Sequence, residues 1–206
     1  MALVLGTNCG FVTVAPTGYP AAGGGTTADG RKMVFKDTSP ATAIKVIEMG
    51  WRTGDATEVA NFEVGLYAAD GASGEAGTRL YVDDTNAKGT TSGWKVVTGL
   101  DWGISPSTIY WLAVQLDDTA TSTYINRESS GGAGYDIATD TTLTDPFGGG
   151  ALSDSDGILA IYAVYEAAPP APVPPKVDNY PVQTGSVNIR KKDTLSQRAY
   201  LSRGVT

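Results

Sequence analysis

The sequence contains no histidine and only one cysteine, Cys9, in 206 residues. Histidine is the side chain best suited to proton transfer near neutral pH, and it is the commonest metal ligand. Its absence excludes Ser-His-Asp catalysis, Cys-His catalysis and zinc–histidine sites. A single cysteine excludes an intramolecular disulfide and a thiolate metal cluster within one chain. We interpret Cys9 as a small, half-buried apolar residue.

Long apolar runs are absent as well. No segment approaches the roughly 20 apolar residues that a membrane-spanning helix requires, so we expect no membrane contact. Residues 1–6 lack the basic start and the longer apolar run of a secretory signal. Unless an export signal was removed earlier, we expect the chain to be made and kept in the cytosol.

Glycine is abundant, at 26 residues, and Thr, Ser, Asp and Ala fill the gaps between short apolar runs. No segment sustains a helical period for long. This pattern predicts an all-β domain with many turns. The two glycine-rich stretches 17–31 and 126–156 are predicted to be surface loops with short strands at most.

Apolar periodicity places the strands. Residues 61–67 alternate, with Phe62, Val64 and Leu66 on one face, and this predicts a half-exposed antiparallel strand. Residues 107–116 and 157–166 are apolar on both faces, as in the central strands of a two-sheet sandwich. Further strands are predicted over residues 42–52, with an irregularity near Gly50, and over residues 79–82 and 93–98.

A change of composition after Glu166 predicts a domain boundary. Residues 167–175 read Ala-Ala-Pro-Pro-Ala-Pro-Val-Pro-Pro, which favours polyproline II at about 3.1 Å per residue, or roughly 28 Å in all. We therefore divide the chain into a β-sandwich domain (1–166), a proline-rich linker (167–181) and a basic C-terminal arm (182–206).

The charge distribution supports this division. Residues 176–206 carry six basic and two acidic side chains, a net charge of +4, whereas residues 1–175 carry nine basic and twenty acidic ones, a net charge of −11. Within the arm, residues 186–192 could form a short strand, and Thr194 with Gln197 has capping-box spacing. Such short segments are predicted to become ordered only against a partner.

The acidic residues provide only weak candidates for a metal site or for a catalytic pair of carboxylates. Asp154 and Asp156 resemble the start of a calcium loop, but Ile158 stands where an EF-hand needs its next oxygen ligand. Either a Ca²⁺ ion held by loop carboxylates and carbonyls or a plain acidic turn fits this stretch. The doublets Asp83–Asp84 and Asp117–Asp118 point to opposite faces of a strand, so neither is a glycosidase pair. We interpret both doublets as solvated turn entries.

Exposed aromatic rings can form flat platforms for sugars. Tyr110 and Trp111 lie in a strand that is apolar on both faces, so we assign them to the core. Four other rings are candidate glycan contacts, and the two within glycine- and serine-rich loops are expected to be the most exposed of the four. The four are Trp94, Trp102, Tyr124 and Tyr135, of which Tyr124 and Tyr135 are the loop residues.

Residues 40–165 resemble a recurrent β-sandwich pattern of tailed-phage virion proteins and some bacterial surface proteins. The resemblance rests on Leu66–Tyr67 before a glycine-rich hairpin, on Gly93–Trp94, and on the Tyr-Trp-Leu-Ala run of residues 110–113. It implies a jelly-roll-like sandwich, as in head-decoration proteins, fibre domains and carbohydrate-binding modules. The pattern contains no catalytic residue, and the linker and the arm lie outside it.

The leading hypothesis is a non-enzymatic structural protein of a phage particle, located in the virion as capsid decoration or as part of a tail or fibre. Its partners would be capsid or tail subunits and further copies of itself as a homo-oligomer, and no cofactor is expected. In this hypothesis the arm docks on a neighbouring subunit and orders on binding. The arm residues predicted to do so are Arg190, Lys191, Lys192, Arg198, Tyr200 and Leu201.

Three alternatives remain open at this stage. A carbohydrate-binding module or adhesin would contact host polysaccharide through the loop aromatics, and a glycan-degrading enzyme would need two suitably spaced acids. The arm could also be a solvated tail without a partner. Nucleic-acid binding is disfavoured, because a body with a charge of −11 repels phosphate and no aromatic residues interleave the basic cluster.

Overall fold

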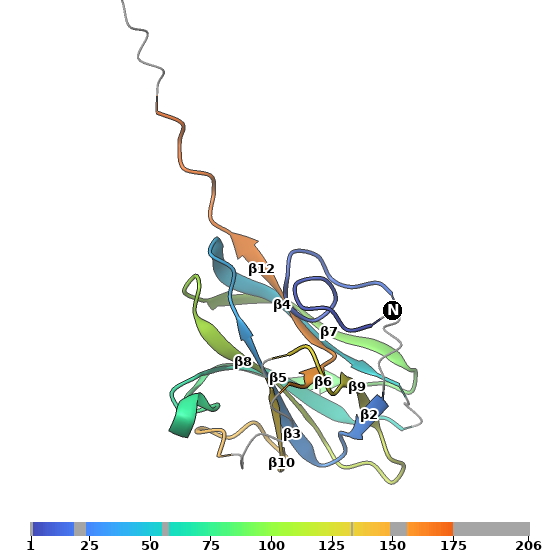
Figure 1. Ribbon diagram of the computed structural model, residues 1–206. Coiled ribbons are helices and arrows are strands. Elements are labelled where there is room, and N and C mark those ends of the chain that lie inside the picture. Colours follow the sequence, from blue (N-terminus) through green and yellow to red (C-terminus); the bar gives the residue numbers. More distant parts are fainter. Residues whose placement is uncertain (1, 19–23, 55–57, 133, 149–155, 175–206) are drawn as a thin grey trace, which may run out of the picture. The chain divides into compact units, whose positions relative to one another are not determined.

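The computed structural model describes residues 2–18, 24–54, 58–132, 134–148 and 156–174 (Figure 1). The chain divides into two units, Met1–Pro169 and Pro170–Thr206. All strands of the described residues belong to the first unit. In the second unit, residues 170–174 are exposed and form neither helix nor strand.

The helices and strands in the described part of the first unit are twelve β-strands and a single 3-10 turn at Ala72–Gly74. The strands are β1 (Gly10–Val12), β2 (Gly24–Thr27), β3 (Arg31–Thr38), β4 (Ala43–Thr53), β5 (Asn61–Ala68), β6 (Arg79–Ala87), β7 (Gly93–Gly103), β8 (Ile109–Leu116), β9 (Tyr124–Glu128), β10 (Tyr135–Thr139), β11 (Ile158–Leu159) and β12 (Ile161–Ala167).

These strands form two sheets that pack face to face (Figure 1). One sheet has the order β10-β3-β8-β5-β6, and the other has the order β1-β12-β4-β9-β11, with β7 added to β4 and β2 added to β9. All pairs are antiparallel except β1 with β12. The predicted all-β two-sheet sandwich is confirmed.

The connectivity is jelly-roll-like. The chain changes sheet at each step from β3 to β4 to β5, and again from β6 to β7 to β8 to β9. The neighbours β3-β8-β5-β6 therefore face the neighbours β1-β12-β4-β7, which is the strand arrangement of a double-sheet jelly roll. The parallel β1–β12 pair at one edge departs from a fully antiparallel roll.

Strand β8 lies at the centre of the five-stranded sheet, as its two apolar faces predict. Leu112 and Val114 belong to the core between the sheets. Trp111 and Ala113 face the other way, where Leu143 and Phe147 cover them. The outer face of this sheet is thus a second buried layer, closed by the segment of residues 140–148.

The same layer corrects the prediction for β5. Its outer face was expected to be exposed, but Glu63 is only 9% exposed and Tyr67 is fully buried. The covering segment is far away in the sequence, so the alternation of β5 alone does not reveal it. Strand β3, which was not predicted at all, lies beside β8 in the same sheet.

The outer face of the other sheet carries a smaller apolar cluster of Val12, Tyr162 and Val164. Tyr162 lies across Gly50, where a Cβ atom would come 2.5 Å from the ring, so this position in β4 requires glycine. The hydroxyl of Tyr162 donates a hydrogen bond of 2.6 Å to Glu48. The irregularity expected near Gly50 lies instead between Val46 and Glu48, where the register with β7 shifts.

Two further strands are longer than predicted. β6 extends to Ala87 and β7 to Gly103, so the doublet Asp83–Asp84 lies inside a strand and is not a turn entry. Asp117 does follow directly after β8, as expected. Cys9 is fully buried, not half-buried, and desolvation raises the pKa of its thiol to about 12, helped by Asp37 and Glu128.

Candidate functional site

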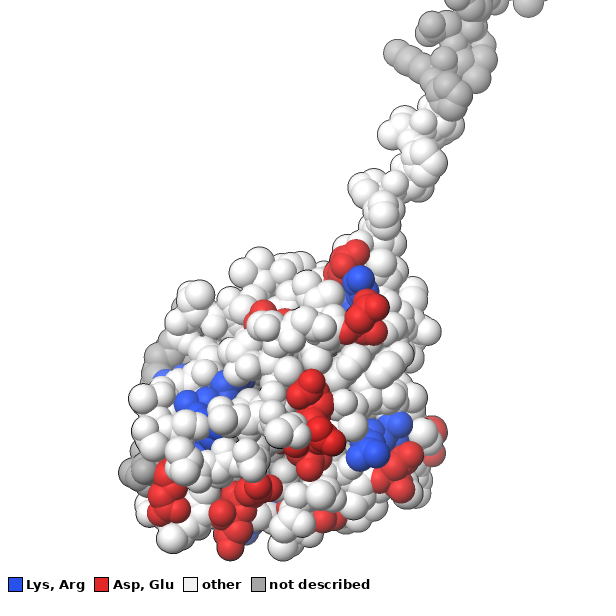
Figure 2. Space-filling model, turned by 180° about the vertical axis from the view of Figure 1, so that it is seen from behind, with Lys and Arg blue, Asp and Glu red and all other residues white. Residues whose placement is uncertain are grey.

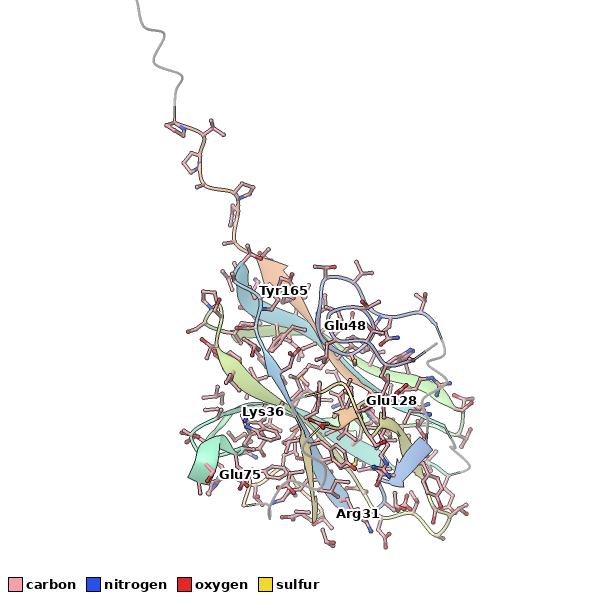
Figure 3. The ribbon with its side chains drawn as sticks, viewed as in Figure 1. Arg31, Lys36, Glu48, Glu75, Glu128 and Tyr165 are labelled. Carbon is pink, nitrogen blue, oxygen red and sulfur yellow. The ribbon has the colours of Figure 1, made fainter. Side chains whose placement is uncertain are left out.

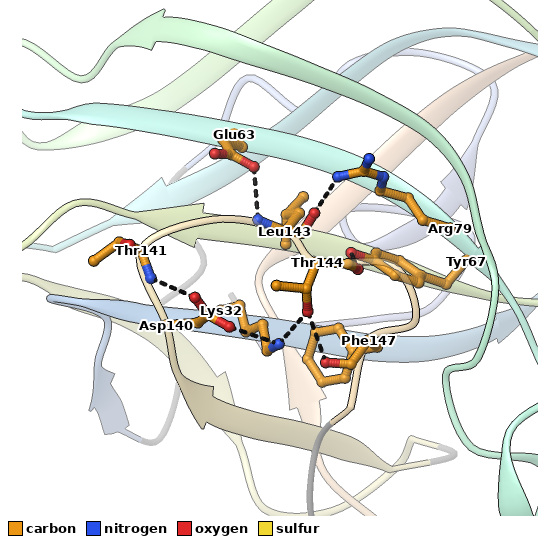
Figure 4. Close-up of polar contacts among 9 residues, drawn as sticks. All are labelled: Lys32, Glu63, Tyr67, Arg79, Asp140, Thr141, Leu143, Thr144 and Phe147. Carbon is orange, nitrogen blue, oxygen red and sulfur yellow. Dashed lines mark hydrogen bonds and ion pairs between the residues drawn. The ribbon is translucent and has the colours of Figure 1, made fainter.

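The segment of residues 140–148 is held on the five-stranded sheet by buried polar side chains (Figure 4). Lys32 on β3 is 3% exposed, and its ammonium group forms an ion pair of 2.9 Å with Asp140. The same group donates a hydrogen bond of 2.6 Å to the hydroxyl of Thr144 and lies 4.9 Å from the ring centre of Phe147. Burial of a lysine is tolerated here because it is paired.

A second set of contacts fixes the same segment from β5 and β6. Glu63 accepts a hydrogen bond of 2.7 Å from the backbone N–H of Leu143, and the hydroxyl of Tyr67 donates one of 2.7 Å to the carbonyl of Thr144. The guanidinium of Arg79 donates to the carbonyl of Leu143. Burial raises the pKa of both Glu63 and Tyr67. These ionisable groups therefore serve to attach a covering layer.

Three further ionisable groups have pKa values shifted by burial, a feature that is common at functional sites. Desolvation raises the pKa of Asp136 on β10 to about 6 and lowers the pKa values of Lys88 and Lys95. Lys88 is 2% exposed, and its ammonium group has no hydrogen-bond partner among the described residues. The fields of Asp29 and Glu58 oppose the downward shift of its pKa.

The sequence contained no signal for Lys88, because a lysine between strands reads as a solvated residue. Lys95 donates a hydrogen bond of 2.7 Å to the carbonyl of Thr91, and Asp136 accepts one of 2.7 Å from the N–H of Ile137. Asp136 and Lys95 belong to different sheets. Their pKa values are shifted because each side chain is buried at a different place, and the two residues do not form one catalytic site.

Two of the four predicted glycan contacts are buried. Tyr135 was expected to be exposed in a loop, but it is 3% exposed, pairs with Phe35 in the sheet, and accepts a hydrogen bond of 2.6 Å from Arg127. Trp102 is 8% exposed and stacks on Tyr81 with ring centres 5.5 Å apart. Neither ring offers a free face of the kind that stacking on a sugar requires.

The other two predicted rings are more accessible. Tyr124 on β9 is 38% exposed. Trp94 on β7 is partly buried, packs edge-on against Tyr162, and donates its indole N–H to the carbonyl of Gly18 over 3.0 Å. Thr53 pairs with both Gly93 and Ile125, so the strands that carry the two rings lie on opposite sides of β4 at this position.

The remaining predicted site residues fall largely outside the described residues. This holds for Asp154 and for the six arm residues Arg190, Lys191, Lys192, Arg198, Tyr200 and Leu201. Asp156 is described, and its carbonyl accepts a hydrogen bond of 2.7 Å from Gly132. Within the described ranges, no group of three or more Cys, Asp or Glu side chains is arranged to hold a metal ion.

The end of β12 leads directly into the proline-rich segment, and Tyr165 lies close to this end (Figure 3). Lys45 on β4 forms ion pairs of 3.3 Å with Glu166 and 3.0 Å with Asp101 on β7. Hydrogen bonds to Asp101 and then to Glu166 raise the pKa of Lys45. Lys45 therefore links the end of the last strand to β4, and it links β4 in turn to β7.

Strand β6 forms an edge of the five-stranded sheet. Among the described residues it pairs with β5 alone. The hydroxyl of Tyr81 donates to the carbonyl of Gly103, and Gly103 in turn pairs with Lys45. Along β6, Leu80 is 40% exposed and Asp84 is exposed. Acidic side chains are also spread over the face of the sandwich seen in Figure 2, where basic ones are confined to a few places.

An open groove of about 600 Å³ lies at the start of β6. Leu80 and Ile109 supply its exposed apolar surface, and Asp70 lies on its rim. Ser107, which also lines it, has a φ of +51°, a left-handed conformation that is uncommon for residues other than glycine. A second open groove, of about 200 Å³, is lined by Val59, Asn61 and Ala87 at the other end of the strand.

The chain was compared with protein-family models, curated proteins and solved structures, and none of them matches it. Within the part of the chain that the structure describes, no helix is both long and apolar enough to cross a membrane. A functional assignment for this protein therefore has to rest on its own residues.

Proposed function

We propose that the chain is a non-enzymatic structural component of a tailed-phage particle, either decorating the capsid or forming part of a tail or fibre. Its sandwich is displayed outward, and its arm, residues 182–206, docks on neighbouring subunits. The observation that carries the proposal is the closure of the sandwich by its own segments. Residues 140–148 cover one sheet, and the buried charges of Lys32 and Glu63 are used to hold them there.

A sandwich closed in this way is well suited to be a rigid module that is carried by another part of the chain. The proline-rich segment begins immediately after β12, and the ion pair between Lys45 and Glu166 joins the end of that strand to β4. The net charge of +4 beyond residue 175, against −11 before it, suits attachment of the arm to an acidic surface. These features support a display domain joined to an anchor.

The test is attachment to particles that lack the protein. We expect the full chain to bind such particles and a chain ending at Glu166 to fail, with circular dichroism showing that the shortened chain is folded. A matched control carries residues 182–206 in shuffled order, which keeps the charge and removes the sequence. Full occupancy by the shortened chain would refute the proposal. Equal binding by the shuffled chain would show that the arm attaches through its charge and not through its sequence.

A second candidate function is glycan binding, which is compatible with display on a particle. The observation that favours it is the exposure of Tyr124, together with the position of Trp94 and Tyr124 on the two strands that flank β4 at Thr53. We expect Tyr124→Ala to weaken binding to a polysaccharide panel at least tenfold, because stacking of a ring is lost. Tyr165→Ala removes a partly buried ring elsewhere and serves as the control. Equal binding by both variants would remove this candidate.

A further inference from the structure

The edge strand β6 offers a row of unpaired backbone groups on one side. It spans nine residues, Arg79–Ala87, and pairs with β5 on its other side only, as far as the described residues show. Tyr81 to Asp83 pair without interruption, and register shifts bound this stretch on both sides. Unpaired edges of this kind accept an added strand from another chain. The regular part of the edge suits a short strand.

Charge distinguishes β6 from the other long edge, β7. Asp83 and Asp84 lie near the centre of β6, and none of the ion pairs among the described residues involves either. On β7 the exposed Asp101 is already paired with Lys45. The free edge of β6 is therefore acidic and open to a basic segment, whereas the acidic group on β7 already has a basic partner.

One segment of this chain complements that edge. Residues 186–192 read Ser-Val-Asn-Ile-Arg-Lys-Lys, in which Val187 and Ile189 alternate with polar residues as in a strand. Arg190 and the two lysines that follow it bring three positive charges to one end of this segment. Val187 or Ile189 can cover the exposed Leu80 while the basic residues face the aspartates.

Chain length and stiffness indicate a second copy as the acceptor. Eighteen residues separate Ala167 from Ser186, which can span up to about 60 Å. The first nine residues after Glu166 favour a stiff polyproline rod of roughly 28 Å, and such a rod disfavours a tight return to the edge of the same molecule. The same length lets the arm reach a neighbouring molecule.

We propose that residues 186–192 of one molecule add as a strand to the free edge of β6 in a second copy of this chain. This inference rests on the proposed function and names the docking surface for its arm. The donor and acceptor surfaces differ, so repeated docking builds a ring or a row of molecules, and reciprocal docking builds a dimer. Backbone hydrogen bonds supply affinity, and the facing charges favour the arm over other segments.

Mixed disulfide cross-linking tests the geometry. One full-length chain carries Thr85→Cys, and a second carries a single cysteine placed in turn at residues 187–190. Adjacent strands bring Cα atoms to about 4.5–5.5 Å, which is within disulfide range. We expect a disulfide between the two different chains for at least one position, and none with Thr98→Cys on β7. Cys9 is buried and stays in both chains. Cross-links equal at both edges, or absent at every arm position, overturn the inference.

Charge reversal tests the same contact without cross-linking. In sedimentation of the full chain, Asp84→Lys is expected to weaken self-association about tenfold, and Lys191→Glu with Lys192→Glu to do the same. Combining the three changes is expected to restore at least part of the affinity. Asp118→Lys changes the charge equally at an exposed position after β8, outside β6, and is expected to have no effect. If Asp84→Lys and Asp118→Lys weaken self-association equally, the association depends on net charge alone, and docking on β6 is overturned.

The outcomes separate this inference from the function on which it rests. A purified chain that stays monomeric, while its arm still attaches it to particles, overturns docking on β6 and leaves the proposed function standing. A chain that neither self-associates nor needs its arm for attachment overturns both. Association that survives deletion of residues 182–206 overturns the inference, because the arm is then not the donor.

Discussion

The covering segment of residues 140–148 should contribute a large part of the stability of the sandwich. Phe147 is 1% exposed, packs edge-on against Tyr67 with ring centres 5.4 Å apart, and lies under the ammonium group of Lys32. Phe147→Ala deletes this ring from a closed layer, and such truncations cost about 3–5 kcal/mol. For a domain of this size, we expect the melting temperature to fall by about 10 °C.

The assay is thermal and urea unfolding of the full chain, followed by far-ultraviolet circular dichroism. Thr142→Ala is the matched control, because this residue is exposed in the same segment. Its effect is expected to stay within about 0.5 kcal/mol. If Phe147→Ala and Thr142→Ala melt within a degree of each other, residues 140–148 do not form the second buried layer described above.

Three further predictions concern single buried positions. Lys88→Met is expected to stabilise the chain by about 1–2 kcal/mol in urea unfolding, because it removes a buried ammonium group without a hydrogen-bond partner among the described residues; destabilisation would mean that the ammonium is well paired. The pKa of Asp136, raised to about 6, means that the folded state binds more protons than the unfolded state between about pH 4 and 6, so stability falls as pH rises through this window. Asp136→Asn is therefore expected to be more stable than the wild type at pH 7 by on the order of 2–3 kcal/mol and equal to it below pH 4, and a pH-independent difference between the two would contradict this cause. Gly50→Ala is expected to lower the melting temperature by several degrees, because its Cβ would collide with the ring of Tyr162, and the double variant with Tyr162→Ala, which opens that space, should show no additional loss from the alanine at residue 50.

The sequence predicted the sandwich because β-strand patterns are local. Residues 109–116 are apolar on both faces, and β8 does lie at the centre of its sheet between two buried layers. The alternation in residues 61–67 gave the inward face of β5 correctly, since Phe62, Val64 and Leu66 all join the core. Each of these predictions needed only the side chains of one strand.

The errors arose where burial depends on a distant segment. Glu63 reads as solvated, but it contacts Leu143, which is 80 residues away in the sequence. Tyr135 follows a glycine- and serine-rich stretch, but it is placed in the sheet by pairing with β3, whose two lysines concealed its strand character. The burial of Lys88 could not be predicted either, because the acidic residues that act on it, Asp29 and Glu58, are distant in the sequence.

The central claim is that residues 182–206 anchor a displayed sandwich on a neighbouring subunit. The most direct measurement is an electron cryo-microscopy map of the assembly that contains this chain, at a resolution that traces the arm. We predict ordered density for the arm against a neighbouring subunit, with the sandwich projecting outward. A map in which the sandwich itself makes the contacts, and the arm touches no subunit, would contradict the account.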